Sequence, residues 1–203
     1  MTKLLLSTMA LGKRLQVDNS YVTVGLTNPK SPSNVGAVMR AAGCYCVDQV
    51  LYTGQRYANA AKYNGSKHNT DTKNAHEKIP LKAARNFENI EALSAELPEN
   101  TKIICVDLVE GATPLPHFQH PDQAIYIFGP EDGTISQSVI NNADGVVYVP
   151  TVGCMNLAAS VNVLLYDRLA KSLVNSNQID SDNALIKKSR DTNNKVKVNL
   201  KHE

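Results

Sequence analysis

Short apolar runs alternate with longer segments of helical periodicity along most of this chain. β-Branched and aliphatic residues dominate the short runs, and Pro, Gly or Asn stands close after several of them, as is typical of strands. The predicted strands cover 21–26, 47–52, 103–108, 124–128 and 145–149, and the predicted helices cover 34–44, 87–97, 136–142 and 157–173. This alternation predicts an α/β fold: a mostly parallel sheet with helices on both faces.

The 203 residues suit one compact domain with short appendages. We expect an N-terminal arm over 1–20, the α/β domain over 21–170, and a polar, flexible C-terminal tail over 171–203. The apolar stretch near the start is too short for a secretion signal, and no run approaches the ~18 apolar residues of a membrane span. The sequence therefore predicts a cytoplasmic protein without membrane contact.

The net charge of +2, from 21 basic and 19 acidic side chains, argues on its own against a polyanionic partner. That average hides a basic segment over 54–85, which holds seven basic and two acidic residues together with two tyrosines and two histidines. A long basic loop with interleaved aromatic residues favours nucleic-acid binding, although a merely solvated surface loop is the alternative. The candidate RNA-binding residues are Arg56, Lys62, Lys67 and Lys73.

Several common kinds of chemical site are missing from the sequence. The four cysteines, Cys44, Cys46, Cys105 and Cys154, have neither disulfide nor zinc spacing, and we expect reduced, buried, small apolar residues. No histidine cluster has metal spacing, so no metal site is predicted. A dinucleotide-binding glycine fingerprint, a P-loop and a nucleophile elbow are also missing. Any nucleotide site must therefore be of another kind.

Three loops follow predicted strands, and open α/β sheets bind ligands at the carboxyl ends of their strands. The first loop leads into a helix that Ser33 or Asn34 is suited to cap and that carries Arg40 in its second turn. The second loop holds Glu131 between two glycines, as a candidate partner for Arg40. The third loop opens the last predicted helix with Asn156. The plainer alternatives are a structural ion pair, an ordinary turn and a simple N-cap.

Together the three loops resemble the three sequence motifs of the SpoU/TrmH-type RNA 2′-O-methyltransferases of the SPOUT superfamily. The matching segments read NVGAVMR at 34–40, IFGPEDG at 127–133, and VP at 149–150 followed by MNL at 155–157. The resemblance spans about residues 21–170 and leaves the arm and the tail outside it. It implies a domain whose C-terminal part is tied in a deep trefoil knot, a rare exception to the usual rules of chain topology.

The resemblance also implies a cofactor and an assembly. The knotted loops of such proteins hold S-adenosylmethionine in a bent conformation, and the active site lies at the interface of a homodimer. Arg40 then approaches the cofactor and the target ribose, from its own or from the partner subunit. The cofactor-binding residues implied here are Leu108, Gly129, Val149, Cys154 and Met155.

The implied reaction transfers a methyl group to a ribose 2′-hydroxyl of RNA, and tRNA is expected ahead of rRNA. The implied catalytic residues are Arg40, Asn34, Glu131 and Asn156. Because a guanidinium stays protonated in proteins, we expect Arg40 to align the phosphate and the hydroxyl rather than to act as a base. Glu131 would orient Arg40 or the helix start, and the two asparagines would position ribose and cofactor.

One motif departs from the family pattern. The third motif of the family reads Ser-Leu-Asn-Val-Ser, whereas residues 154–158 read CMNLA, so both serines are absent. The change favours positioning over a proton relay through hydroxyls, and it leaves open an alternative function, a knotted RNA-binding protein without catalysis. A small-metabolite enzyme on a generic α/β sheet is a third hypothesis, against which the basic segment argues.

Overall fold

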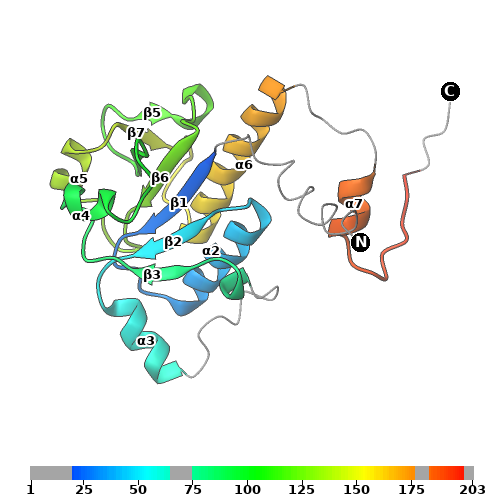
Figure 1. The fold of residues 1–203 in the computed structure, drawn as a ribbon, viewed down its shortest axis with the longest axis horizontal. Coiled ribbons are helices and arrows are strands. Elements are labelled where there is room, and N and C mark those ends of the chain that lie inside the picture. Colours follow the sequence, from blue (N-terminus) through cyan, green and yellow to red (C-terminus); the bar gives the residue numbers. More distant parts are fainter. Residues whose placement is uncertain (1–19, 65–74, 177–182, 199–203) are drawn as a thin grey trace, which may run out of the picture.

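The computed structural model describes residues 20–64, 75–176 and 183–198 (Figure 1). The predicted N-terminal arm, apart from Ser20, and parts of the basic segment and of the tail lie outside these ranges. Within them, no helix is long and apolar enough to cross a membrane. All predicted site residues are described except Lys67 and Lys73.

In this part of the chain, seven parallel strands form one sheet in the order β3-β2-β1-β6-β4-β7-β5. The parallel sheet is confirmed, and all five predicted strands are present. The sequence pattern does not predict β3 and β5, because strands of two or three residues are too short to show a period. The bounds are β1 Tyr21–Leu26, β2 Gln49–Tyr52, β3 Leu81–Ala83, β4 Lys102–Val106, β5 Thr113–Pro114, β6 Gln123–Phe128 and β7 Gly145–Tyr148.

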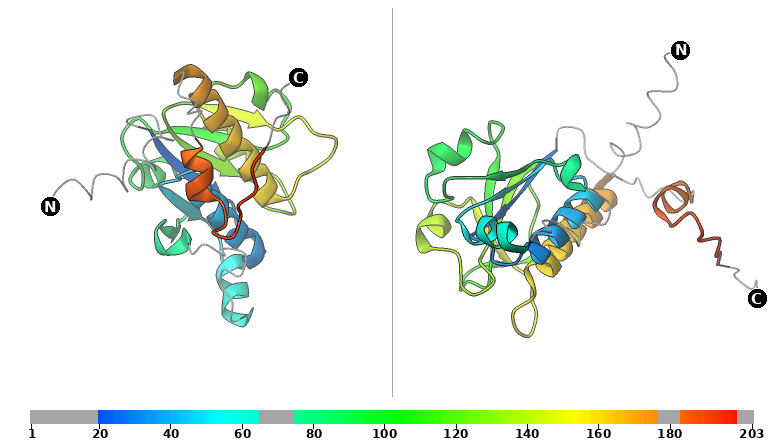
Figure 2. Two further views of the ribbon diagram at one scale, coloured as in Figure 1. Left: turned by 90° about the vertical axis from the view of Figure 1, so that its right-hand side faces the viewer. Right: turned by 90° about the horizontal axis from the view of Figure 1, so that it is seen from below.

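Helices cover both faces of the sheet, as the sequence predicts (Figure 2). α2 and α6 pack side by side against one face, and the short α4 and α5 lie on the other. The trefoil knot stays a prediction. The bounds are α2 Pro32–Cys44, α3 Arg56–Asn64, α4 Ile90–Ser94, α5 Gln137–Asn141, α6 Leu157–Ser176 and α7 Ala184–Ser189, with 3-10 turns at Ala75–Glu77 and Leu115–His117.

The central strands β1 and β6 bury nearly all of their side chains. Along β6, Tyr126 packs into the core formed with α2 and α6, whereas Ile125 and Ile127 pack into the core formed with α4 and α5. Because both faces are covered, these strands read as continuous apolar runs rather than as alternating ones. The parallel strands bring the loops that follow them to one edge of the sheet.

Two helix starts differ from the prediction for local reasons. α2 begins at Pro32, because the Ser31 side chain accepts a hydrogen bond from the Asn34 amide and proline fits a first helical position. The predicted cap at position 33 or 34 is therefore wrong. α4 is shorter than the predicted helix at 87–97, since the Asn89 side chain caps it and only the residues that follow are helical.

The basic segment is not the single long loop that its composition suggests. Its first part forms α3, which projects beyond the sheet (Figure 1), and its last part adds β3 at the sheet edge. The C-terminal segment also contains helix, because α6 runs past the predicted domain end at 170 and α7 forms within the predicted tail.

A partly buried polar network fastens α6 to the segment before β6. His120 Nδ1 lies 2.7 Å from the Tyr126 hydroxyl and Nε2 lies 2.8 Å from Asp167 Oδ2, which also pairs with Lys171 Nζ at 2.7 Å. Arg168 donates to the Tyr126 hydroxyl at 3.2 Å. The contacts fit a neutral imidazole that donates to Asp167 and accepts from Tyr126. Burial lowers the pKa of His120 to about 4, although the hydrogen bond to Asp167 opposes the shift.

Acid should therefore destabilise the fold through His120. Between pH 6.5 and pH 4 the unfolded chain binds a proton that the folded chain does not, so the free energy of unfolding falls as the pH falls. We expect a loss of up to about 3 kcal/mol over this interval in urea denaturation. The loss should be smaller by that amount in His120→Gln, whereas His117→Gln, at an exposed histidine, should follow the wild type. Parallel curves for the wild type and His120→Gln would contradict the assignment.

Candidate functional site

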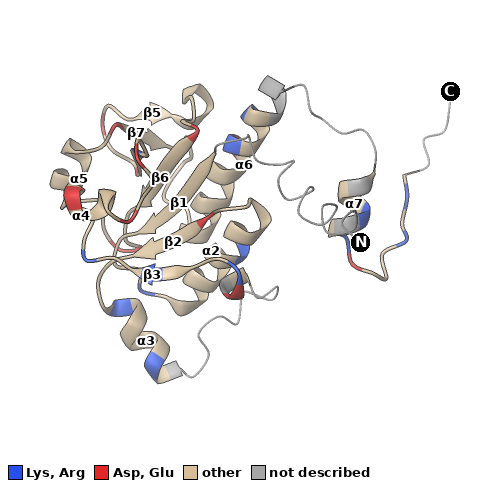
Figure 3. Cartoon of the chain, in the orientation of Figure 1, with Lys and Arg blue, Asp and Glu red and all other residues tan. Residues whose placement is uncertain are grey.

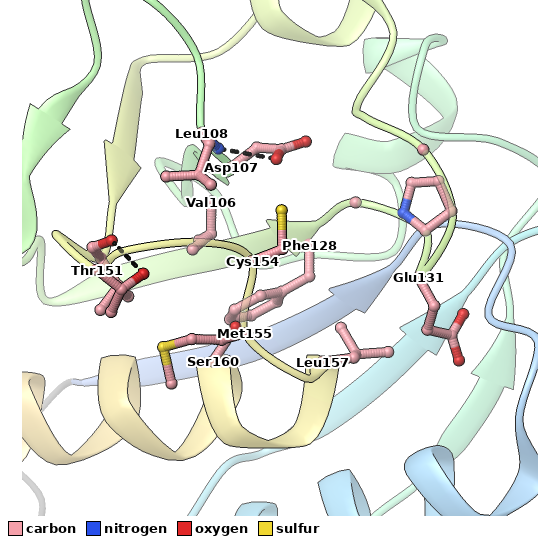
Figure 4. Close-up of a pocket in the computed structure, with 14 residues that line it drawn as sticks. Val106, Asp107, Leu108, Phe128, Glu131, Thr151, Cys154, Met155, Leu157 and Ser160 are labelled. Atoms are coloured by element: carbon pink, nitrogen blue, oxygen red, sulfur yellow. Dashed lines mark hydrogen bonds between the residues drawn. The ribbon is translucent and has the colours of Figure 1, made fainter.

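An open pocket lies where β4, β6 and β7 end, against the first turn of α6 (Figure 4). Its volume of about 140 Å³ is several times the ~10–15 Å³ that one water molecule needs, so it can admit part of an organic ligand. The residues predicted to bind the cofactor all line this pocket: Leu108 after β4, Gly129 after β6, and Val149, Cys154 and Met155 after β7.

Asp107, which the sequence analysis missed, holds one wall of the pocket. Its Oδ2 accepts hydrogen bonds from Thr134 Oγ1 at 2.8 Å and from the Ile135 amide at 2.9 Å, and its Oδ1 accepts one from the Leu108 amide at 2.8 Å. Gly129 packs so closely here that a Cβ on it would lie 2.8 Å from Asp107 Oδ2. The signal available in the sequence was a carboxylate at the end of an apolar strand.

Glu131 joins the pocket to the start of α2. Its Oε2 accepts a hydrogen bond from the Lys30 amide at 2.8 Å, and its Oε1 accepts from the Ser31 amide at 3.1 Å and from Asn34 Nδ2 at 3.2 Å. Partial burial raises the pKa of Glu131, but the hydrogen bonds outweigh burial and hold that pKa below its usual value. The ionised carboxylate therefore fixes the helix start, which is one of the two roles predicted for it.

Asn34 and Asn156 extend these hydrogen bonds to α6. Asn156 Nδ2 donates to Asn34 Oδ1 at 3.1 Å, and Asn156 Oδ1 accepts from the Ala158 amide at 3.0 Å. Asn156 therefore also caps α6, as the plainer interpretation expected. Glu131, Asn34 and Asn156, three of the four predicted catalytic residues, form one hydrogen-bonded chain beside the pocket.

Arg40, the fourth predicted catalytic residue, lies apart from this chain on an exposed position of α2. The ion pair expected between Arg40 and Glu131 is not formed. Glu131 binds the first turn of α2, and Arg40 follows Asn34 by six residues, which is about 9 Å along the helix axis. Arg40 is not among the described residues that line the pocket.

Arg56, predicted to bind RNA, is held by an acidic residue of the second motif. Its NH1 and NH2 donate to Asp132 Oδ1 and Oδ2 at 2.8 and 2.7 Å, and Lys30 Nζ lies 4.0 Å from the same Oδ2. The hydrogen bonds from Arg56 lower the pKa of Asp132. The pair ties α3 to the loop that carries Glu131.

Of the other predicted RNA-binding residues, Lys62 is exposed near the end of α3, whereas Lys67 and Lys73 lie outside the described residues. Figure 3 shows basic residues along α3, on the part of the molecule that projects beyond the sheet. The structure thus leaves Lys62 available to a ligand and engages Arg56 internally.

The cysteines occupy different environments, although all four are predicted to be buried. Cys105 is buried in β4, where burial first and the charge of Asp107 second raise the pKa of its thiol to about 12. Cys44 and Cys154 are exposed, so the prediction is wrong for these two. Among the described residues, no group of three or more His, Cys, Asp and Glu side chains could hold a metal ion.

A sequence model of the SpoU rRNA Methylase family matches residues 21–166. The match covers most of the chain and includes every residue that lines the pocket. The chain belongs to the SpoU rRNA methylase family. No curated protein matches the sequence.

Solved structures share the fold at low sequence identity. The SpoU methyltransferase AviRb from Streptomyces viridochromogenes, in complex with the cofactor AdoMet, has a TM-score of 0.65 and 19% identity, over 80% of this chain and 64% of its own. The A. aeolicus TrmH/SpoU tRNA modifying enzyme has a TM-score of 0.65 and 16% identity, over 85% and 87%. A structure that concerns the 2-OH methylation of C/U34 on tRNA has a TM-score of 0.62 and 18% identity, over 77% of this chain and 99% of its own. This chain thus spans about three-fifths of AviRb.

Proposed function

We propose that this protein transfers a methyl group from S-adenosylmethionine to a ribose 2′-hydroxyl of RNA, with tRNA favoured over rRNA. One observation carries the proposal: the pocket built by the motif loops is joined, through Glu131, Asn34 and Asn156, to the helix that bears Arg40. Membership of the SpoU rRNA methylase family supports an RNA substrate. The tRNA-related structures, whose lengths this chain nearly spans, favour tRNA.

The pocket fits S-adenosylmethionine in its chemistry. Phe128 and Leu157 offer apolar surface of the kind that suits an adenine ring. Gly129 has no side chain, so its backbone groups are accessible from the pocket. A Cβ at this position would collide with the Asp107 carboxylate. The charged groups that line the pocket are carboxylates, which suit a cofactor of net positive charge. When bound, the sulfonium of this cofactor supplies an electrophilic methyl group.

The residues of the chain act in this proposal by positioning. Asn34 donates to Glu131 and accepts from Asn156, so both amide side chains are held in one orientation beside the pocket. We assign to the two asparagines the placement of ribose and cofactor. Arg40 aligns the phosphate and the 2′-hydroxyl and stabilises charge, because a guanidinium cannot accept a proton. The hydroxyl proton passes to phosphate or to water.

The absence of the two motif serines supports positioning over a relay through hydroxyls. Cys154 and Ala158 stand at those positions. Thr151 and Ser160 bring hydroxyls to the pocket, but both donate to nearby backbone carbonyls. The same absence favours the second candidate function, a knotted RNA-binding protein without catalysis, which would bind RNA but not the cofactor.

We further propose a homodimer with a trefoil-knotted C-terminal part, in which Arg40 reaches the pocket of the partner subunit. The exposure of Arg40 and its position outside the pocket of its own chain support this arrangement. α6 also presents Val163 and Tyr166, which are 37% and 62% exposed. Exposed apolar side chains on one helix suit contact with a second copy of the chain.

Removal of the Arg40 guanidinium tests the proposed reaction. Purified wild-type protein should methylate ribose 2′-hydroxyls in RNA from cells that lack the gene, with transfer followed by radiolabelled cofactor and by mapping of the modified sites. Arg40→Ala should lower the rate at saturating RNA by roughly 10²–10³-fold, as loss of a transition-state contact does, with cofactor affinity unchanged. Lys102→Ala, which removes an exposed cation outside the basic segment, should keep that rate. A wild type that binds no cofactor and methylates no RNA would leave the binding-protein alternative.

A side chain at position 129 tests the location of the cofactor. Gly129→Ala places a Cβ 2.8 Å from Asp107 Oδ2, so the carboxylate or the loop must move. Calorimetry should show S-adenosylmethionine binding weakened by at least about tenfold. Gly145→Ala is the matched control, because its Cβ would lie 3.5 Å from the nearest atom, an ordinary contact. Equal affinities for the two variants would place the cofactor elsewhere.

Salt dependence of RNA binding tests the basic surface on α3. Lys62→Ala should weaken RNA binding and reduce the slope of log affinity against log salt by about one, as loss of one phosphate contact does. Lys102→Ala serves as the control, since Lys102 stands at the start of β4, away from the strand ends that lead into α3, and pairs with Asp144. An identical salt slope in the wild type and Lys62→Ala would remove α3 from the RNA-binding surface.

A further inference from the structure

The candidate pocket is acidic. Of the fourteen described residues that line it, Asp107 and Glu131 are carboxylates, and none is Lys, Arg or His. The basic side chains of Arg56 and Lys30 lie instead against Asp132, which does not line the pocket. A ligand in the pocket therefore meets a negative field that no cationic lining residue offsets.

The two carboxylates serve different sides of the site. Glu131 lies on the side that adjoins α2, where its oxygens accept the hydrogen bonds that fix the helix start (Figure 4). Asp107 follows β4 on another side of the pocket, next to Leu108 (Figure 4). Within the described part of the chain, Asp107 Oδ1 accepts a hydrogen bond from the Leu108 amide alone, so a lone pair remains for a ligand.

We propose that Asp107 lies against the sulfonium of the cofactor and makes the pocket prefer S-adenosylmethionine over its demethylated product, S-adenosylhomocysteine. The inference rests on the proposed function, because it concerns the same pocket and the same cofactor. In methyl transfer the ribose oxygen forms the new bond to carbon, and the sulfur keeps the electron pair of the bond that breaks. The cofactor thus has one net positive charge at neutral pH, and its product has none.

Three protein donors, from Thr134, Ile135 and Leu108, hold the Asp107 carboxylate in place. Its charge therefore stays in position after the methyl group has left. The attraction that favours the cationic cofactor no longer acts on the neutral product, so the same residue favours the exchange of product for fresh cofactor. For charges a few ångströms apart in a solvent-accessible pocket, the preference amounts to about 3- to 10-fold in affinity.

Calorimetry on the full chain with three ligands tests this role. The ligands are S-adenosylmethionine, S-adenosylhomocysteine, and sinefungin, in which a carbon that bears a protonated amine replaces the methylated sulfonium. The wild type should bind the two cationic ligands more tightly than the neutral product. Asp107→Asn should lower this preference by about 3- to 10-fold. Thr134→Val is the matched control: it removes one hydrogen bond to the carboxylate but keeps the charge, so the preference should stay unchanged even where all three affinities fall.

The outcomes separate the role of Asp107 from the proposed function. An Asp107→Asn variant with an unchanged preference overturns the proposal, because the residue then only anchors the loop at 134–135. A wild type that binds the product as tightly as the cofactor overturns it as well, and this comparison decides alone where Asp107→Asn does not fold. A wild type that binds none of the three ligands overturns the cofactor assignment itself.

Discussion

Three hydrogen bonds to the Glu131 carboxylate join the loop after β6 to the first turn of α2. Without the carboxylate, two backbone amides and the Asn34 side chain would lose their acceptor, and the two partly buried donors, Ser31 N and Asn34 Nδ2, would cost about 1 kcal/mol each. The contact also sets the orientation of Asn34, and through it that of Asn156. The candidate site therefore depends on a link between two loops that local sequence preferences do not bring together.

The parts of the fold that burial dictates could be predicted from the sequence. β1 and β6 lie between two helix layers, so both their faces are apolar. Each strand therefore reads in the sequence as a continuous apolar run that predicts a buried strand. β3 and β5 lack this signal: β3 has three residues, one of them Lys82, and β5 has two, one of them Pro114. They become strands through pairing with β2 and β7, which is a tertiary effect.

The loop residues that line the candidate pocket could be predicted from the sequence. The side-chain contacts between distant loops were harder to predict. The family resemblance implied Leu108, Gly129 and Cys154, and all three line one pocket because parallel strands end at one edge. For Glu131 the sequence left two partners open, Arg40 and the helix start, because spacing along α2 does not say which turn faces a loop about a hundred residues away. Asp107 was missed because its role follows from a contact with the loop at 134–135.

The pairing of β1 with β6 has a consequence for how the protein matures. Lys30 and Glu131 are 101 positions apart in the sequence, and β6 pairs with β1 over the whole length of both strands. During synthesis, the backbone edge of β1 that pairs with β6 stays unpaired until the second half of the chain has left the ribosome. Folds dominated by such distant pairings form slowly and expose strand edges on the way. The site therefore arises late, and a nascent chain of this kind has an aggregation-prone strand edge until β6 is in place.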